Sequence, residues 1–185
     1  MKIAFIGTHG VGKTTLCYDL AARLKRLDYS LDVVKEVARE CPLPINQETT
    51  YSAQAWILHT QIARELEAAS RHEVVVCDRS VLDNYAYLVH KLGRIAALEP
   101  LVAQWLTSYT LLVKVPIWQA PADDGVRDVA EAFQRGVDST LDDLVASFGV
   151  EVLALRPTET ASWTTRVVGA LQLPSRAHQE SLFPE

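Results

Sequence analysis

The segment GTHGVGKT at residues 7–14 constrains the fold more than any other part of the sequence. It matches the pattern G-x-x-x-x-G-K-[ST] in full, and it lies between an apolar run, residues 1–6, and an amphipathic segment, residues 14–27. A strand, a glycine-rich turn and a helix start present inward-pointing backbone N–H groups and the positive end of a helix dipole. The segment therefore predicts a phosphate-binding loop for ATP with Mg²⁺.

The same pattern predicts a role for individual residues of this loop. Lys13 is expected to reach the β- and γ-phosphates, and the Thr14 hydroxyl to ligate Mg²⁺. His9 stands at a variable position of the pattern, which favours a loop-filling residue over a catalytic one. Because the loop binds phosphates and not the base, the choice between ATP and GTP stays open. The predicted nucleotide-binding residues are Gly7, His9, Gly10, Val11, Gly12, Lys13, Thr14 and Thr15.

Along the rest of the chain, short apolar runs alternate with segments of helical periodicity. This alternation predicts an α/β fold with a parallel sheet covered on both faces, in which ligands bind beyond the carboxyl ends of the strands. No repeat or linker divides the chain, so we predict one domain over residues 1–173 and a flexible tail over residues 174–185. Expected strands cover residues 1–6, 31–35, 73–77, 109–115 and 150–155, and expected helices cover residues 14–27, 50–70, 81–92, 97–107, 129–148 and 160–171.

The overall charge and the cysteines limit the kinds of partner and compartment. The formal net charge is -5, which argues against nucleic acid as a partner without excluding a local basic groove. Three widely spaced cysteines form neither a disulfide framework nor a zinc site, and they are typical of a reducing cytosol. No apolar run approaches the roughly 20 residues of a membrane span, and the phosphate loop begins where a leader peptide would continue. We expect a cytoplasmic protein, with a homodimer left open.

Asp78 and Arg79 directly follow the predicted strand EVVVC. An aspartate at this place holds the hydration shell of Mg²⁺ in proteins with a phosphate loop, although it could instead cap the next helix. Arg79 could bind an anionic acceptor or neutralise charge on a transferred phosphoryl group, and a surface salt bridge is the alternative. We predict that Thr14 and Asp78 form the metal site and that Asp78 and Arg79 are catalytic, with Arg79 also contacting the acceptor.

Glu36 follows the second predicted strand, in the segment KEVARE, at the edge of the sheet where the phosphate loop lies. A carboxylate there can accept the proton of an acceptor hydroxyl. Arg39 lies on the same side if the segment is helical, and it could bind the acceptor. A solvated charge pair is the competing interpretation. We predict that Glu36 is catalytic and that both side chains contact the acceptor.

The polar segment QAPADDGVRD, residues 119–128, is a candidate lid between a strand and a helix, with Gly125 as a hinge. Arg127 would close over the phosphates and stabilise the charge of the transition state, and Arg135 is a weaker alternative. An exposed loop ahead of a capped helix is the competing interpretation. We place the lid around residues 119–136.

Polar and aromatic side chains of the helical segments are candidates for the acceptor pocket. Asp83 and Tyr87 are predicted to contact the acceptor, and Asn84 could contact its sugar or base. The alternatives are core packing for the aromatic residues and helix-surface polarity for Asp83 and Asn84. The aromatic candidates are Tyr51, Trp56, Tyr85, Tyr87 and Trp105.

Taken together, these segments resemble the P-loop small-molecule kinases. GTHGVGKTT, EVARE and DDGVRD are similar to the nicotinamide riboside kinase domain and its ATP-binding relatives. CDRSVLDNYAY resembles the D/E-R-S segment of deoxynucleoside kinases and the Asp-Arg segment of thymidylate kinase. The resemblance extends over residues 1–145. It implies a three-layer P-loop NTPase fold with a five-stranded parallel sheet, helices on both faces and a lid.

The resemblance also implies an activity, which is Mg²⁺-dependent transfer of the γ-phosphoryl group of ATP to a hydroxyl or phosphate of a nucleoside-like or nucleotide-like acceptor. By position, Glu36 corresponds to the kinase base, Arg79 to the acceptor-site arginine and Arg127 to the lid arginine. Two other activities stay open. One is a polynucleotide kinase acting on DNA or RNA, and the other is a regulatory NTPase that hydrolyses ATP or GTP to control a protein partner. No guanine-reading N-K-x-D motif occurs in the chain.

Overall fold

The computed structural model describes residues 1–45, 48–118 and 131–173. In these residues five strands form one parallel sheet in the order β2-β3-β1-β4-β5, which confirms the predicted sheet and its five strands. The predicted strand at residues 150–155 is shorter than expected, since its pairing with β4 covers two residues. The strands are β1 Lys2–Ile6, β2 Leu31–Val34, β3 Val74–Asp78, β4 Leu111–Lys114 and β5 Leu153–Ala154.

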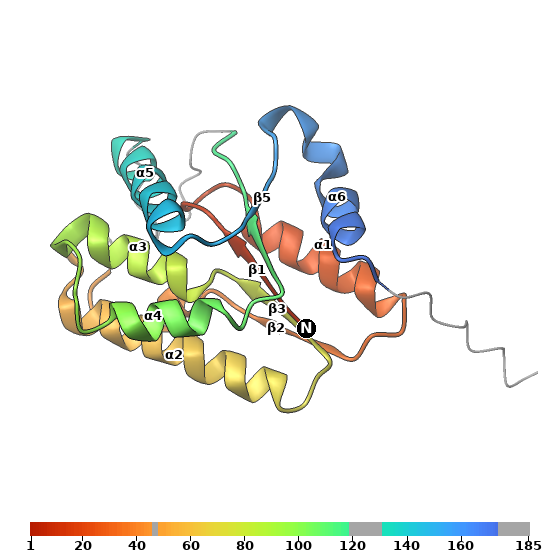
Figure 1. Cartoon of the computed structure of the whole chain (residues 1–185), viewed down its shortest axis with the longest axis horizontal. Helices are drawn as coiled ribbons and strands as arrows, with labels where there is room; N and C mark the ends of the chain where they lie inside the picture. The colour runs from red at the N-terminus through yellow and green to blue at the C-terminus, as the bar shows by residue number, and fades with distance from the viewer. Residues whose placement is uncertain (46–47, 119–130, 174–185) are drawn as a thin grey trace, which may run out of the picture.

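Helices cover both faces of this sheet, as predicted, and give a three-layer arrangement (Figure 1). Helices α1 and α6 lie together on one face, and α2, α3, α4 and α5 lie on the other. The last predicted helix begins later than expected, because a 3-10 segment with non-helical φ/ψ at Glu159 precedes it. The helices are α1 Lys13–Lys25, α2 Tyr51–Ala69, α3 Val81–Leu92, α4 Glu99–Leu106, α5 Glu131–Phe148 and α6 Trp163–Ala170, with 3-10 helices η1 Val37–Glu40 and η3 Pro157–Ser162.

Two apolar cores form between the layers, one on each face of the sheet. Every residue of β1 and β3 is buried, because both strands lie in the middle of the sheet under helices on either side. This double burial explains why their sequences are continuous apolar runs instead of alternating patterns. Among the described residues, no helix combines the length and the apolarity that crossing a membrane requires.

The carboxyl ends of β1, β2 and β3 bring three sequence segments to one edge of the sheet. These segments are the phosphate loop after β1, the segment KEVARE after β2 and the segment DRS after β3. An unusual number of polar side chains are buried at this edge, including Lys13, Glu36 and Arg79. Since buried polar groups need hydrogen-bond partners, their concentration at this edge of the sheet indicates a binding site.

Candidate active site

The phosphate loop is held in place by side chains from other parts of the fold. The backbone N–H of Gly7 donates to Asp83 Oδ1 of α3 at 2.8 Å. Gln134 Nε2 of α5 donates to the His9 carbonyl at 2.9 Å, and the His9 N–H donates to Tyr87 Oη at 3.1 Å. The loop is therefore preorganised by α3 and α5, and the His9 side chain packs within it, only 3% exposed.

Gly7 occupies a backbone conformation and a space that exclude a side chain. Its φ is +143°, and a Cβ built there would lie 2.6 Å from the Val115 carbonyl oxygen after β4. We expect Gly7→Ala to lower the free energy of unfolding by about 3 kcal/mol and to weaken nucleotide binding. Gly149→Ala is the matched control, because Gly149 has a φ of +62° with nothing within 4 Å.

Thermal unfolding and a calorimetric ATP titration check this prediction. Gly149→Ala should lose only the cost of a left-handed backbone, about 1 kcal/mol, and should bind ATP normally. An equal loss of stability in both variants would contradict the close approach of Gly7 to Val115.

Lys13 is buried at the start of α1, and its ammonium donates to the Gly7 carbonyl at 2.7 Å and to the Thr8 carbonyl. Burial lowers the pKa of Lys13 from 10.5 to about 8, and the positive charge of Arg79 adds to this effect. The carboxylates of Asp83, Asp78 and Glu36 partly oppose it. Phosphate oxygens would supply the negative charge that the buried ammonium lacks in this arrangement.

This lowered pKa predicts that ATP binding weakens as the pH rises. Lys13 is cationic below its pKa of about 8 and loses its charge above it, so the cation that binds phosphate is depleted. Between pH 7 and pH 9 the affinity for ATP should fall roughly tenfold, measured by calorimetry. Lys13→Arg is the control, because a guanidinium stays charged and its affinity should not change over this range. Equal wild-type affinity at both pH values would contradict the assignment of Lys13 to the phosphates.

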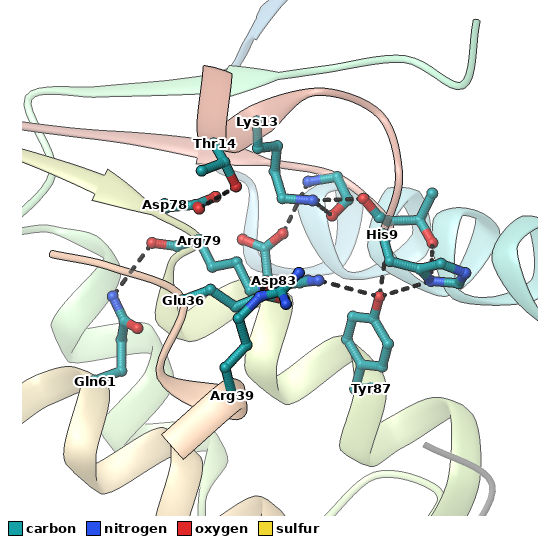
Figure 2. Close-up of polar contacts among 12 residues, drawn as sticks. His9, Lys13, Thr14, Glu36, Arg39, Gln61, Asp78, Arg79, Asp83 and Tyr87 are labelled. Atoms are coloured by element: carbon teal, nitrogen blue, oxygen red, sulfur yellow. Dashed lines mark hydrogen bonds and ion pairs between the residues drawn. The ribbon is translucent and has the colours of Figure 1, made fainter. Parts of the chain in front are cut away.

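Thr14 and Asp78 come together next to Lys13, across 64 residues of sequence. The Thr14 hydroxyl donates to Asp78 Oδ2 at 2.5 Å (Figure 2). Asp78 is the last residue of β3, and the N-cap of α3 is Ser80, so the alternative of Asp78 as the helix cap is wrong. Residues 1–45, 48–118 and 131–173 contain no cluster of three or more His, Cys, Asp or Glu side chains suited to a metal. A hydroxyl and one carboxylate fit Mg²⁺, which keeps several waters and takes other oxygens from phosphates.

Glu36 and Arg79 form a buried ion pair beside the phosphate loop. Arg79 Nε donates to Glu36 Oε1 at 2.7 Å, and Arg39 Nε donates to Glu36 Oε2 at 2.9 Å. Burial opposes the charge of Arg79, but Glu36 and further negative groups outweigh it, so the pKa of Arg79 lies well above its usual range. Because Glu36 and Arg79 are 7% and 4% exposed, Glu36 is not solvated and Arg79 does not form a surface bridge. Arg39, the other partner of Glu36, is 41% exposed, so the solvated-pair interpretation stays open for Arg39.

A cavity opens from this ion pair toward α2 and α3. Tyr87 closes one side, and its ring lies under the Arg79 guanidinium at 4.9 Å. Within the described part of the chain, two buried donors that belong to the cavity wall have no hydrogen-bond partner, namely Arg79 Nη1 and Asn84 Nδ2. Its polar lining consists of His9, Glu36, Arg39, Gln54, Arg79, Asn84 and Tyr87. Such donors are unusual in native structures, and they point to a ligand that carries hydrogen-bond acceptors.

Asp83 lies under the phosphate loop and not on the surface of α3, so the helix-surface alternative is wrong. Its Oδ1 accepts from Gly7, and its Oδ2 accepts from the N–H and the hydroxyl of Ser80, each at 2.9 Å. Burial raises the pKa of Asp83, opposed by Lys13 and Arg79 and by the two backbone N–H groups. Contact between Asp83 and an acceptor stays a prediction.

The other acceptor candidates do not all reach the cavity. Tyr85 is fully buried, with its hydroxyl between Glu99 and the Ile95 N–H. Trp105 donates to the buried Glu65 of α2 and does not line the cavity, and Trp56 and Tyr51 also lie outside the cavity lining. Core packing or exposure therefore explains these four aromatic residues. Tyr87 lines the cavity, and its contact with an acceptor stays a prediction.

The proposed lid falls mostly outside the described residues. Residues 119–130, with Gly125 and Arg127, are not among them. Residues 131–136 form the start of α5, where Arg135 is exposed and pairs with Glu131 at 3.7 Å. The predicted tail over residues 174–185 also lies outside the described part.

Sequence reasoning missed three glutamines that the structure places at the site. Gln54 lines the cavity, Gln134 holds the phosphate loop, and Gln61 Nε2 donates to the Arg79 carbonyl at 3.2 Å. A polar residue on the buried stripe of an amphipathic helix was the available signal. Its partner is set by tertiary packing and cannot be read from helical periodicity.

Comparisons with known proteins support this description of the fold. A family model described as an AAA domain matches residues 2–166, and none of the curated proteins matches the chain. Deoxyadenosine kinase from M. mycoides with products dCMP and a flexible dCDP bound has a TM-score of 0.65 at 14% identity, covering 92% of this chain and 98% of that one. The structure of that kinase with bound dATP has a TM-score of 0.66 at 14% identity, covering 94% and 100%. These similarities show a shared fold.

Proposed function

The chain belongs to the AAA-domain family whose model spans residues 2–166, and we propose that it is a kinase. It transfers the γ-phosphoryl group of ATP, with Mg²⁺, to a hydroxyl or phosphate of a nucleoside-like or nucleotide-like acceptor. Its compartment, a reducing cytoplasm, stays a prediction. The fold shared with a deoxyadenosine kinase supports the proposal, although the low sequence identity leaves the acceptor to be found by experiment.

The observation that carries this proposal is the cavity beside the phosphate loop. Its wall contains a carboxylate, Glu36, whose partner Arg79 is buried between the cavity and Lys13. An NTPase that transfers phosphate only to water needs no such cavity with unpartnered buried donors. A phosphotransferase needs it, because the acceptor must be oriented and water excluded.

The described residues fit the steps of an in-line transfer. Lys13 and the loop N–H groups bind the β- and γ-phosphates, and Arg79 lies between them and the cavity. The acceptor hydroxyl forms a bond to the γ-phosphorus while the bond from that phosphorus to the β–γ bridging oxygen breaks, and ADP leaves. The hydroxyl proton passes to a carboxylate oxygen of Glu36. Arg39 and Tyr87 border the same space and orient the acceptor.

Mg²⁺ would be held by the Thr14 hydroxyl and, through water, by Asp78, whose side chains already lie in contact. When bound, the ion neutralises charge on the β- and γ-phosphates. Lys13 and Thr14 are neighbours at the start of α1, so the lysine and the metal ligand approach the phosphates from the same turn.

A screen of ATP consumption with Mg²⁺ tests the proposal. The acceptors are nucleosides, nucleoside monophosphates, nicotinamide riboside and short oligonucleotides, each compared with ATP alone. We expect one class of small acceptors to raise turnover well above the rate without acceptor. Turnover that is equal with and without every acceptor would contradict the proposal and favour a regulatory NTPase. Stimulation by oligonucleotides alone, with a steep dependence on salt, would favour a polynucleotide kinase instead.

A further inference from the structure

Arg79 has a backbone conformation that a non-glycine residue rarely adopts. Its φ is +100°, although it is an arginine with a buried side chain between Glu36 and Tyr87. Such conformations persist only where the surrounding structure enforces them, and they cluster at functional sites. The residues that enforce this one should therefore affect how the guanidinium is aimed.

The peptide carbonyl of Arg79 is held by Gln61 from the middle of α2 (Figure 2). Gln61 is 0% exposed, and its Nε2 donates to the Arg79 carbonyl at 3.2 Å and to Glu65 Oε1 at 2.8 Å. Both partners are acceptors, so the amide can face them only with its NH₂ group. In the described part of the chain Gln61 Oε1 has no donor, which shows that the amide orientation is set at the Nε2 side.

Glu65 fixes the orientation of Gln61 because it is fully buried and saturated with donors. Lys2 Nζ and Trp105 Nε1 donate to its Oε2, each at 2.7 Å, and the Tyr109 hydroxyl donates to its Oε1 at 2.7 Å. The Lys2 ammonium also lies over the Trp105 ring at 4.5 Å. A buried carboxylate with this many charged and neutral donors is a rigid anchor.

The same anchor reaches the backbone after Arg79 by a second route. The Tyr109 hydroxyl, which donates to Glu65, also accepts from the Val81 N–H at 3.1 Å. The two peptide groups on either side of Ser80 are therefore tied to one carboxylate, Glu65, through Gln61 and Tyr109. The candidate active site is thus connected to a buried network that begins at Lys2, the first residue of β1.

We propose that Gln61, oriented by Glu65, is a positioning residue that holds the left-handed backbone of Arg79 and so aims its guanidinium at Glu36 and the acceptor cavity. The effect on turnover rests on the proposed function. The effect on the placement of Arg79 does not, so the two can be tested separately.

Hydrogen exchange of the Arg79 side chain tests the placement without any ligand. The Arg79 Nε–H is buried against Glu36, and its signal in a ¹H–¹⁵N spectrum can be identified by its loss in Arg79→Lys. In Gln61→Met, which removes the donor at nearly constant volume, exchange of this N–H should become roughly tenfold faster. Gln61→Leu is the second variant if the methionine variant does not fold.

Val167→Ala is the control for a general loss of stability. It removes buried apolar contacts on the other face of the sheet and leaves the contacts among Arg79, Gln61 and Glu65 in place. Its Arg79 exchange rate should equal that of the wild type. Unchanged exchange in folded Gln61→Met would overturn the proposal, and so would an equal acceleration in Val167→Ala.

Kinetics with the acceptor that gives the highest wild-type turnover provide the second readout. Gln61→Met should raise the acceptor KM roughly tenfold and leave the Kd for ATP unchanged, whereas Val167→Ala should change neither. A wild-type acceptor KM in Gln61→Met would overturn the proposed role of Gln61 in the reaction. If the wild type transfers phosphate to no acceptor, the proposed function fails, and the exchange measurement alone decides whether Gln61 positions Arg79.

Discussion

Lys13→Ala should reduce the rate of phosphoryl transfer by a factor of about 1000 or more. The ammonium of Lys13 is buried within the phosphate loop, where it contacts two loop carbonyls and where burial and the charge of Arg79 lower its pKa. Alanine removes the one lysine or arginine of the loop segment, residues 7–14, and leaves the negative charge of the γ-phosphate with less compensation during transfer. Initial rates at saturating ATP and acceptor measure the effect.

Lys25→Ala is the control for this variant, since Lys25 is exposed at the other end of α1. Its rate should equal that of the wild type. A rate for Lys13→Ala within tenfold of the wild-type rate would contradict the proposed role of the phosphate loop in transfer.

Glu36→Gln should slow transfer by a factor of about 100 to 10,000 while leaving the affinity for ATP near normal. The substitution keeps the volume but removes the oxygen that accepts a proton, and it places an NH₂ group against one of two arginine donors. Both effects act on the acceptor side of the site, because Glu36 lines the acceptor cavity. Single-turnover rates and a calorimetric Kd for ATP separate the two quantities.

Glu40→Gln provides the comparison, because Glu40 ends η1 and its exposed side chain pairs with Arg64. This variant should transfer at the wild-type rate. A wild-type rate in Glu36→Gln would show that another group accepts the proton, or that the acceptor is already ionised.

Much of the fold could be predicted from the sequence, because its signals are local. The apolar runs MKIAFI and EVVVC indicate central strands that are buried on both faces, and the GTHGVGKT pattern locates the turn between β1 and α1. The expectation that Glu36 and Asp78 face one crevice followed from the parallel sheet, whose strand ends meet at one edge. The structure places both side chains there.

The remaining features depend on contacts between distant segments. From the sequence, Asp78 and not Ser80 was considered as the cap of α3, and the bond from Gly7 to Asp83 could not be predicted before β1 and α3 are placed. The backbone of Arg79 could not be predicted, because a left-handed arginine is enforced by Gln61, Glu65 and Tyr109 and not by its own sequence neighbours. Trp105 was a candidate for the acceptor pocket, but its indole N–H donates to Glu65. Helical spacing alone does not distinguish a pocket residue from one that contacts a buried carboxylate.

The most direct test of the proposed activity follows the γ-phosphoryl group itself. The protein is incubated with Mg²⁺, the acceptors of the screen and ATP radiolabelled at the γ-phosphate, and the products are separated by chromatography. We predict that the wild type places the label in a phosphorylated acceptor and that Lys13→Ala does not. Label that appears only as inorganic phosphate, at the same rate with and without acceptor, would contradict the assignment of this site to a kinase.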